Sequence, residues 1–299
     1  MPSFLSRVID YILRKSRLNQ KLREEIDQNT LDQHPRDVPS QALIKKYHIK
    51  TEYVTKHIVY TWSIQEKPGK IGIFYLHGGA YVHGLSKMHF RLFQSLIKQT
   101  GCTLIVPDYP LVPHASADEI YSFLIECYDN YMDQFEHVII MGDSAGGGLA
   151  LGLAQQLNQD GYRNHHLMLL SPWLDVTMEN KEIDLIQPLD PILNRETLKI
   201  VGKMYARERH LKDSMISPLY GSLKGIDSIS VWIGTKDILY ADALALEALG
   251  KKESVSIDMR IYHDMLHTWM FFGLKESSQA IKEMAEHIQQ IQQNRGGHK

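Results

Sequence analysis

The stretch His137-Val-Ile-Ile-Met-Gly-Asp-Ser-Ala-Gly146 runs from a short apolar segment into the pattern G-x-S-x-G, and a segment rich in Gly, Ala and Leu follows it. This order predicts a buried strand, a sharp turn at Ser144 and a helix. Such a turn holds a serine in a strained conformation with its hydroxyl exposed, and glycines at 142 and 146 leave room for it. The context favours a nucleophilic serine over a Gly-rich turn that only packs a helix against a sheet.

Other segments along the chain have the apolar, β-branched composition of strands, and amphipathic helical patterns separate them. The expected strands are residues 53–64, 71–76, 103–106, 137–141, 166–170, 230–233 and 255–262. Segments such as IGIFYL and VIIM are almost wholly apolar, as in strands that are covered on both faces of a parallel sheet. The alternation predicts an α/β fold with a doubly wound, mostly parallel central sheet flanked by helices.

Two of the helical segments carry clear signals. Ser116 and Glu119 form an S-x-x-E capping box at the start of one helix. The last helix should bury one face, and Gly296 and Gly297 lie beyond it. That face consists of Ile281, Met284, Ala285, Ile288 and Ile291.

The 299 residues are expected to form a single α/β domain, 1–299, with a helical cap. Residues 1 to about 48 are helical and polar in pattern before any strand begins. Residues from about 175 to 225 intervene between strands, with Pro188, Pro191 and Pro218 punctuating helical pieces. We expect these two segments to pack together as a lid.

Composition excludes several classes of partner. The chain has 33 basic and 35 acidic residues, a formal charge of −2, so no basic excess indicates nucleic acid or anionic lipid as a partner. No membrane partner is expected, because no apolar run approaches the roughly 18 residues of a spanning helix. Charged residues interrupt the first 25 residues, which argues against a signal peptide. Cys102 and Cys127 are interpreted as buried thiols in a reducing compartment, so we expect a cytoplasmic protein. The sequence leaves open whether the chain forms a homodimer.

A serine hydroxyl needs a neighbouring base, and its reaction needs donors for the developing oxyanion. The strand at 71–76 leads into His77-Gly-Gly-Ala-Tyr81, where small residues let backbone N–H groups approach a ligand. This loop is therefore a candidate oxyanion hole. The position of His77 at the head of the loop suits orientation of the loop better than the role of base.

These motifs resemble those of the bacterial hormone-sensitive-lipase-like group of α/β-hydrolases, which contains many carboxylesterases. HGGA at 77–80 is similar to the family motif HGGG, and residues 142–147 match GDSAGG. Residues 108–114 resemble DYRLAPE, with Pro110 and His114 as departures. The resemblance implies the α/β-hydrolase fold, and it implies that the oxyanion donors are the N–H groups of Gly78, Gly79 and Ala145.

The acid and the base should follow the serine in the order Ser, Asp, His. The strand at 230–233 ends in a turn that resembles the family's GxxDxL, which makes Asp237 the candidate acid. The segment His267-Thr-Trp resembles the family's HGF, so His267 is preferred to His263 as the base. Both residues follow predicted strands, so they can meet Ser144 at the carboxyl edge of the sheet.

A metal site is the rival interpretation of His263 and His267, which have the i, i+4 spacing of an HExxH helix. That motif needs a glutamate on a helix, whereas this segment contains Asp264 and follows a β pattern. No metal and no cofactor are therefore expected.

The expected reaction is hydrolysis of small carboxylic esters with short acyl chains through a Ser-His-Asp triad and an acyl-enzyme. Tyr81 and Trp173 are candidates for lining the substrate pocket. Two alternatives use the same fold. One is an arylformamidase or amide hydrolase with the same triad, and the other is a non-catalytic ligand-binding protein, against which the presence of His267 argues.

Overall fold

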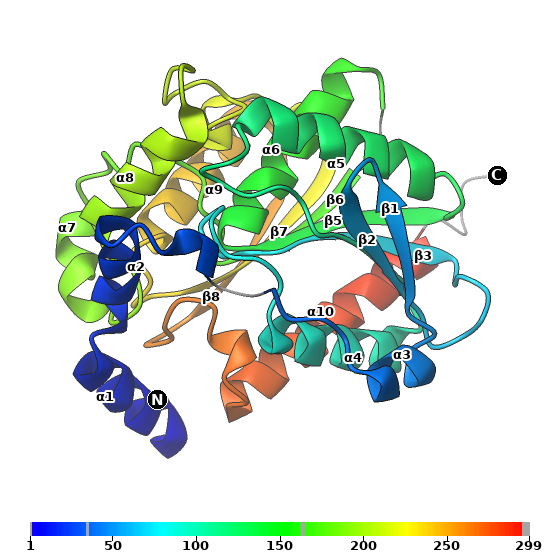
Figure 1. Cartoon of the computed structure of the whole chain (residues 1–299), viewed down its shortest axis with the longest axis horizontal. Helices are drawn as coiled ribbons and strands as arrows, with labels where there is room; N and C mark the ends of the chain where they lie inside the picture. The colour runs from blue at the N-terminus through cyan, green and yellow to red at the C-terminus, as the bar shows by residue number, and fades with distance from the viewer. Residues whose placement is uncertain (1, 34–35, 163–164, 295–299) are drawn as a thin grey trace.

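The computed structural model describes residues 2–33, 36–162 and 165–294, and its framework is one sheet with helices on both faces (Figure 1). In the described part of the chain the sheet has eight strands in the order β1-β2-β4-β3-β5-β6-β7-β8. The strands are β1 (Lys50–Val54), β2 (His57–Trp62), β3 (Ile71–Leu76), β4 (Thr103–Pro107), β5 (His137–Asp143), β6 (His165–Leu170), β7 (Ile226–Gly234) and β8 (Ile257–Tyr262). Strands β1, β2 and β4 pair antiparallel, and every other pair is parallel. The mostly parallel α/β sheet is therefore confirmed.

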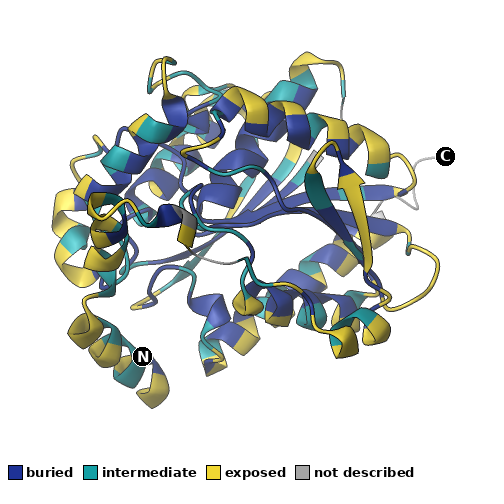
Figure 2. Ribbon diagram, viewed as in Figure 1, coloured by how far each residue is buried: buried dark blue, intermediate teal, exposed yellow. Residues whose placement is uncertain are grey.

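The helices divide the core into two parts, one on each face of the sheet. The α-helices are α1 (Phe4–Ser16), α2 (Leu18–Asp27), α3 (Gln41–Lys46), α4 (Lys87–Thr100), α5 (Ala117–Tyr131), α6 (Ala145–Gln159), α7 (Ile183–Ile186), α8 (Arg195–Ala206), α9 (Tyr240–Glu253) and α10 (Lys275–Asn294). Short 3₁₀ helices are η1 (Leu31–Gln33), η2 (Gln187–Leu189), η3 (Pro218–Tyr220) and η4 (Trp269–Phe271). Helices α5, α6, α8 and α9 pack in one apolar cluster, and α4 and α10 pack in the other. Figure 2 shows that the central strands between these layers are buried.

One predicted strand is wrong. Residues 53–64 were expected to form a single strand, but the chain reverses after Val54 and forms the antiparallel pair β1 and β2. The turn lies at Thr55, whose φ is 53°. Threonine is an unusual residue for a left-handed position, which glycine or asparagine normally occupies, so the sequence carries no ordinary turn signal there.

Several local predictions are confirmed. Ser116 and Glu119 form a capping box at the start of α5, with each side chain bonded to the other residue's backbone N–H. Met284, Ala285, Ile288 and Ile291 of α10 are buried, whereas Gly296 and Gly297 lie outside the described residues. Cys102 and Cys127 are both free and buried. Within the described ranges no helix is long and apolar enough to cross a membrane.

The two segments assigned to the cap lie as follows. Helix α2 contacts α8, and the Arg14 guanidinium of α1 donates to the carbonyls of Pro188 and Leu189 in η2. Helix α3 lies away from these elements (Figure 1), and its Leu43 and Ile44 pack against the cluster that contains α4. Residues 4–27 and the segment 183–206 are thus the parts of the expected cap that lie side by side.

Candidate active site

Ser144 lies on a tight turn between β5 and α6 and has a φ of 53° and a ψ of −121°. This conformation is strained for a residue with a side chain, and the surroundings hold it. The Ser144 N–H donates to the Leu170 carbonyl at 2.8 Å, and the Ser144 carbonyl accepts from the Trp173 N–H at 2.8 Å. A Cβ on Gly146 would lie 2.0 Å from the Leu76 carbonyl oxygen, so only glycine fits there.

Three side chains that are remote in sequence form a continuous hydrogen-bonded chain. His267 Nε2 lies 3.0 Å from Ser144 Oγ, and His267 Nδ1 lies 2.8 Å from an Asp237 carboxylate oxygen. The structure thus brings together Ser144, Asp237 and His267 as the sequence analysis expected. The residues follow β5, β7 and β8, whose carboxyl ends meet at one edge of the sheet. His263, the other candidate base, is exposed.

Charge around His267 favours its protonated form. Burial alone lowers the pKa of this imidazole, but the Asp237 carboxylate, by its charge and its hydrogen bond, outweighs burial and leaves the pKa above its ordinary value. Asp190 adds to this effect. A histidine with such partners can take the serine proton and be stabilised as the imidazolium that forms.

Asp190 was not identified from the sequence, although it lies beside Asp237, in the loop after η2. It is 2% exposed, and its carboxylate accepts the N–H groups of Ile192, Leu193 and Ile238 at 2.8–3.0 Å. Burial and the nearby Asp237 raise the pKa of Asp190 above its usual range. Ile238 directly follows Asp237, so Asp190 ties the loop of the acid to residues 187–193. The only local signal is an Asp-Pro dipeptide, which reads as a turn.

Asp143 ties the loop 77–81 to the turn of Ser144. One of its carboxylate oxygens accepts from the Tyr75 hydroxyl at 2.7 Å and from the Gly78 N–H at 2.9 Å, and it lies 3.4 Å from His89 Nε2. Burial alone would raise the pKa of Asp143, but His89 and these donors leave the pKa below its ordinary value. The Asp143 carboxylate therefore remains ionised and holds the loop 77–81 through the Gly78 N–H.

This contact changes the expected set of oxyanion donors. The Gly78 N–H is already used by Asp143, so it is not free for a substrate. Gly79 and Ala80 line the same cavity as Ser144, with φ values of 111° and 52°. Among the described residues the N–H groups of Gly79, Ala80 and Ala145 have no hydrogen-bond partner in the fold. We therefore replace Gly78 by Ala80 in the candidate hole and retain Gly79 and Ala145.

His77 is a buried, uncharged residue that supports the loop. Its ring stacks on Tyr109 with centroids 4.1 Å apart, and the Tyr109 hydroxyl donates to the His77 carbonyl at 2.6 Å. Burial lowers the pKa of His77 to about 4. The ring is therefore neutral at pH 7 and lies outside the hydrogen-bonded chain of Ser144, in agreement with an orienting role.

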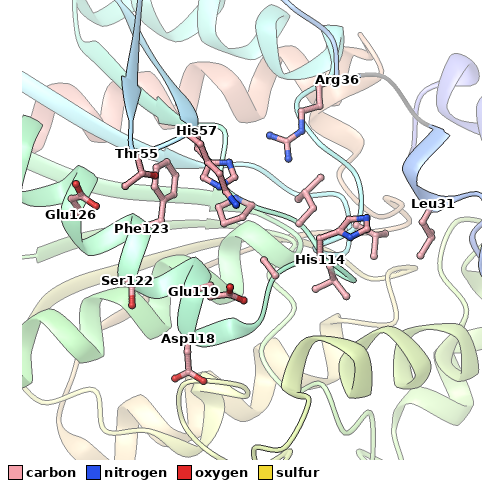
Figure 3. A pocket seen from close by; sticks show the side chains of 16 residues that line it. Leu31, Arg36, Thr55, His57, His114, Asp118, Glu119, Ser122, Phe123 and Glu126 are labelled. Carbon is pink, nitrogen blue, oxygen red and sulfur yellow. The ribbon is translucent and has the colours of Figure 1, made fainter.

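The cavity at Ser144 has a volume of about 420 Å³ and is lined mainly by apolar side chains. Trp173 lines it, as expected, together with Leu22 of α2 and Leu198 of α8. Tyr81 does not reach the cavity: it is 1% exposed and stacks between Trp173 and Tyr205. A second cavity, of about 770 Å³, lies between the β1–β2 turn and α5, with Arg36, His57 and Glu126 in its wall (Figure 3). Ser144, Asp237 and His267 do not line it.

Comparisons with known proteins agree with this architecture. A family model described as alpha/beta hydrolase fold matches residues 73–271. An esterase of Acinetobacter venetianus is 30% identical over 221 residues, which cover 72% of this chain and 73% of that protein. An acetyl-hydrolase of Streptomyces hygroscopicus is 25% identical over 232 residues, 76% of this chain and 78% of that protein.

Solved structures have the same fold. An esterase/lipase from an uncultured bacterium superposes with a TM-score of 0.83 at 23% identity, covering 97% of this chain and 99% of that one. A homologue of hormone-sensitive lipase from a metagenome library superposes with a TM-score of 0.82 at 23% identity and the same coverage. At this identity the superpositions show the fold alone.

Proposed function

Because this chain belongs to the α/β-hydrolase family, we propose that it hydrolyses small carboxylic esters with short acyl chains, using Ser144 as nucleophile, His267 as base and Asp237 as the carboxylate that orients His267. It is a serine hydrolase, and its relatives are named esterase and acetyl-hydrolase. The hydrogen-bonded chain from Ser144 Oγ through the His267 ring to Asp237 carries the proposal.

The proposed cycle begins when His267 Nε2 accepts the Ser144 proton and the serine oxygen attacks the ester carbonyl. Asp237 holds Nδ1–H and with it the tautomer that leaves Nε2 free to accept. The imidazolium then gives its proton to the departing alcohol. Water activated by the same nitrogen releases the acid from the acyl-enzyme.

The N–H groups of Gly79, Ala80 and Ala145 would bind the oxyanion. Fixed backbone donors stabilise the tetrahedral intermediate without reorganisation, by about 3 kcal/mol each. The first turn of α6 adds the positive end of its dipole, since Ala145 is its first residue. The Asp143 contact with Gly78 keeps the loop in place for this task.

The size of the cavity supports the short-acyl preference. A volume of about 420 Å³ is near the lower end of the range for small-molecule sites, roughly 300–1,000 Å³. We propose that residues 4–27 and 183–206 form the cap, within which α2 and α8, but not α1, set the far wall of the cavity. In a series of nitrophenyl esters we expect kcat/KM to be highest at two to four acyl carbons. An optimum at eight or more carbons would contradict the proposed substrate class.

Replacement of Ser144 tests the chemistry. We expect Ser144→Ala to retain its fold by circular dichroism and thermal unfolding and to lose turnover of nitrophenyl acetate by about four orders of magnitude. A fluorophosphonate probe should label the wild type and not this variant. Ser122→Ala, an exposed serine on α5, is the matched control and should keep both activity and labelling.

The same assay separates ester from amide chemistry. Turnover of phenyl acetate and of N-formylaniline, measured side by side, should favour the ester by a large factor. A clear preference for the formamide would replace the proposed substrate with an amide while leaving the triad intact. Activity that persists in Ser144→Ala would contradict the triad itself.

A further inference from the structure

Helix α1 has an orientation that the catalytic proposal does not explain. It lies at the periphery of the molecule (Figure 1), and most of its length is exposed (Figure 2). Its residues nevertheless divide into two faces. The face toward the body carries Ser6 and Asp10 together with Ile9, which packs against the apolar cluster of α4 and α10. The face toward solvent is largely apolar, which is unusual in a soluble protein.

Polar contacts fix the inner face of α1. The Ser3 N–H and hydroxyl donate to the Glu276 carboxylate at the start of α10, at 2.6 and 2.9 Å. Asp10 forms an ion pair with Lys236 at 2.8 Å, and Arg14 donates to the Pro188 carbonyl at 3.0 Å. The helix is thus held along its length, so its outer face is a defined surface of the molecule.

The outer face is a continuous apolar strip. Phe4, Val8, Tyr11 and Ile12 follow the spacing i, i+4, i+7 and i+8, and Leu5 extends the strip at its edge. Phe4 is 75% exposed, Tyr11 63%, Ile12 56% and Leu5 49%. Contiguous exposure of large apolar side chains is unusual on a monomer and marks a surface that binds a partner.

Basic residues border this strip. Arg7, Lys15 and Arg17 are exposed, and in the described part of the chain none of them has an ion-pair partner. The Lys15 ammonium lies over the Tyr11 ring, 5.7 Å from its centroid. Asp10 is the only acidic residue of α1, and its pairs with Arg14 and Lys236 hold it away from the strip. The outer face is therefore apolar and positively charged.

We propose that the outer face of α1 binds the surface of an anionic phospholipid membrane. A helix with large apolar side chains on one face and lysines and arginines at its border lies in the plane of the interface, with its apolar side chains among the acyl chains and its cations at the phosphates. This revises the expectation of no membrane partner, which rested on the charge balance of the whole chain and on the absence of a spanning segment, because the basic residues of α1 gather on one surface.

A second copy of the chain fits this face less well. Two copies packed through their α1 strips would bring Arg7, Lys15 and Arg17 of one copy against the same residues of the other. Like charges at a desolvated contact cost binding energy, and no acidic side chain of the strip offsets them. Phospholipid headgroups supply the missing negative charge.

Binding at α1 would place the cavity of Ser144 close to the membrane. Only Arg17 separates α1 from α2, and Leu18, Lys21, Leu22 and Glu25 of α2 line the cavity. Arg14 also holds the chain at 188–189, just before Ile192 and Leu193 in the cavity wall. An ester that partitions into the headgroup region would therefore meet the cavity at a short distance.

Vesicle sedimentation tests the proposal. The full chain is mixed with vesicles of phosphatidylcholine alone or with phosphatidylglycerol added, at low and at 0.5 M salt. We expect binding to the anionic vesicles, weakened by salt, and about tenfold or more lower partitioning for Phe4→Ser/Tyr11→Ser. The matched control is Tyr53→Ser on β1, a tyrosine that is 69% exposed, which should bind like the wild type.

Two further measurements complete the test. Arg7→Gln/Lys15→Gln should lose the preference for anionic vesicles, and all variants should hydrolyse a water-soluble ester at the wild-type rate. The proposal is overturned if the wild type binds no vesicles or if the Phe4/Tyr11 variant binds them equally well. It is also overturned if sedimentation equilibrium shows that the wild type is a dimer and the Phe4/Tyr11 variant a monomer, and if the wild type does not bind vesicles.

Discussion

At the scale of single residues, the surroundings rather than the serine itself impose the conformation of Ser144. The left-handed backbone is held by hydrogen bonds to Leu170 and Trp173, and the room beside it exists because residue 146 is glycine. The hydroxyl is thereby presented to His267 before any substrate arrives. Preorganisation of this kind lowers the barrier because no group has to move as charge develops.

Asp190 should set the pH dependence of the reaction through its charge. His267 must be neutral to act as base, so kcat/KM rises with pH through its pKa, which lies above the ordinary value. Asp190→Asn removes an anion that raises this pKa, so we expect the acidic limb of the pH profile to move to lower pH. The profile of kcat/KM between pH 5 and 9 measures the shift.

A matched control for this prediction is Asp242→Asn. Asp242 is also buried, and burial raises its pKa to about 7, but its hydrogen-bond partner is Asn180 rather than Ser144, Asp237 or His267. Its replacement should leave the acidic limb unchanged. An unmoved limb in Asp190→Asn, or an equal movement in both variants, would rule out an electrostatic role for Asp190.

Local sequence motifs mark some residues of the site, whereas tertiary contacts alone define the others. Ser144, Asp237 and His267 each follow a strand that the sequence reveals, so their meeting could be predicted. The use of the Gly78 N–H by Asp143 could not, because it depends on how close two loops lie. Asp190 escaped notice for the same reason, since its contact with the loop of Asp237 is made at Ile238, 48 residues away.

At the scale of elements, capping signals were reliable where side chain and backbone satisfy each other within a few residues. The prediction of a single strand at 53–64 is wrong because the chain reverses at Thr55, and threonine is not a residue that indicates a turn. The arrangement of the expected cap was the hardest feature to predict from the sequence, because contacts with distant elements determine where its short helices lie. Helix α3, for example, packs beside α4 through Leu43 and Ile44.

The capping box of α5 predicts a stability effect without a functional one. Ser116→Ala removes the acceptor for the Glu119 N–H and should lower the free energy of unfolding by about 1 kcal/mol. Urea unfolding measures the loss, and hydrolysis should stay at the wild-type rate. Ser95→Ala, in the interior of α4, is the control and should be neutral or slightly stabilising. A loss of the same size at both positions would count against the cap.

At the scale of the whole molecule, burial of neutral histidine links stability to pH. The pKa of His77 is lowered to about 4 in the fold, against about 6.5 when the chain is unfolded. Between these values the unfolded chain binds a proton that the folded chain does not, so stability falls as pH decreases from 6.5 toward 4. At pH 5 this contribution amounts to a loss of about 2 kcal/mol relative to pH 8.

Urea unfolding of the wild type and His77→Gln at pH 8 and pH 5 isolates this contribution. The decrease in unfolding free energy between the two pH values should be smaller in the variant by about 2 kcal/mol. Titration of the His77 ring by nuclear magnetic resonance in the wild type provides a second readout that does not need the variant to fold. A midpoint near 6.5 would contradict the account.

The placement of the reactive groups on three loops, after β5, β7 and β8, has a consequence for chains cut in two. A cleavage in the exposed stretch near residue 208 would leave Ser144 on one fragment and both Asp237 and His267 on the other. Under the proposed mechanism, neither fragment should hydrolyse an ester by itself. Recovery of hydrolysis on mixing the purified fragments would then show that β6 of one fragment can pair with β7 of the other. Ester hydrolysis would in that case measure the association of the two fragments.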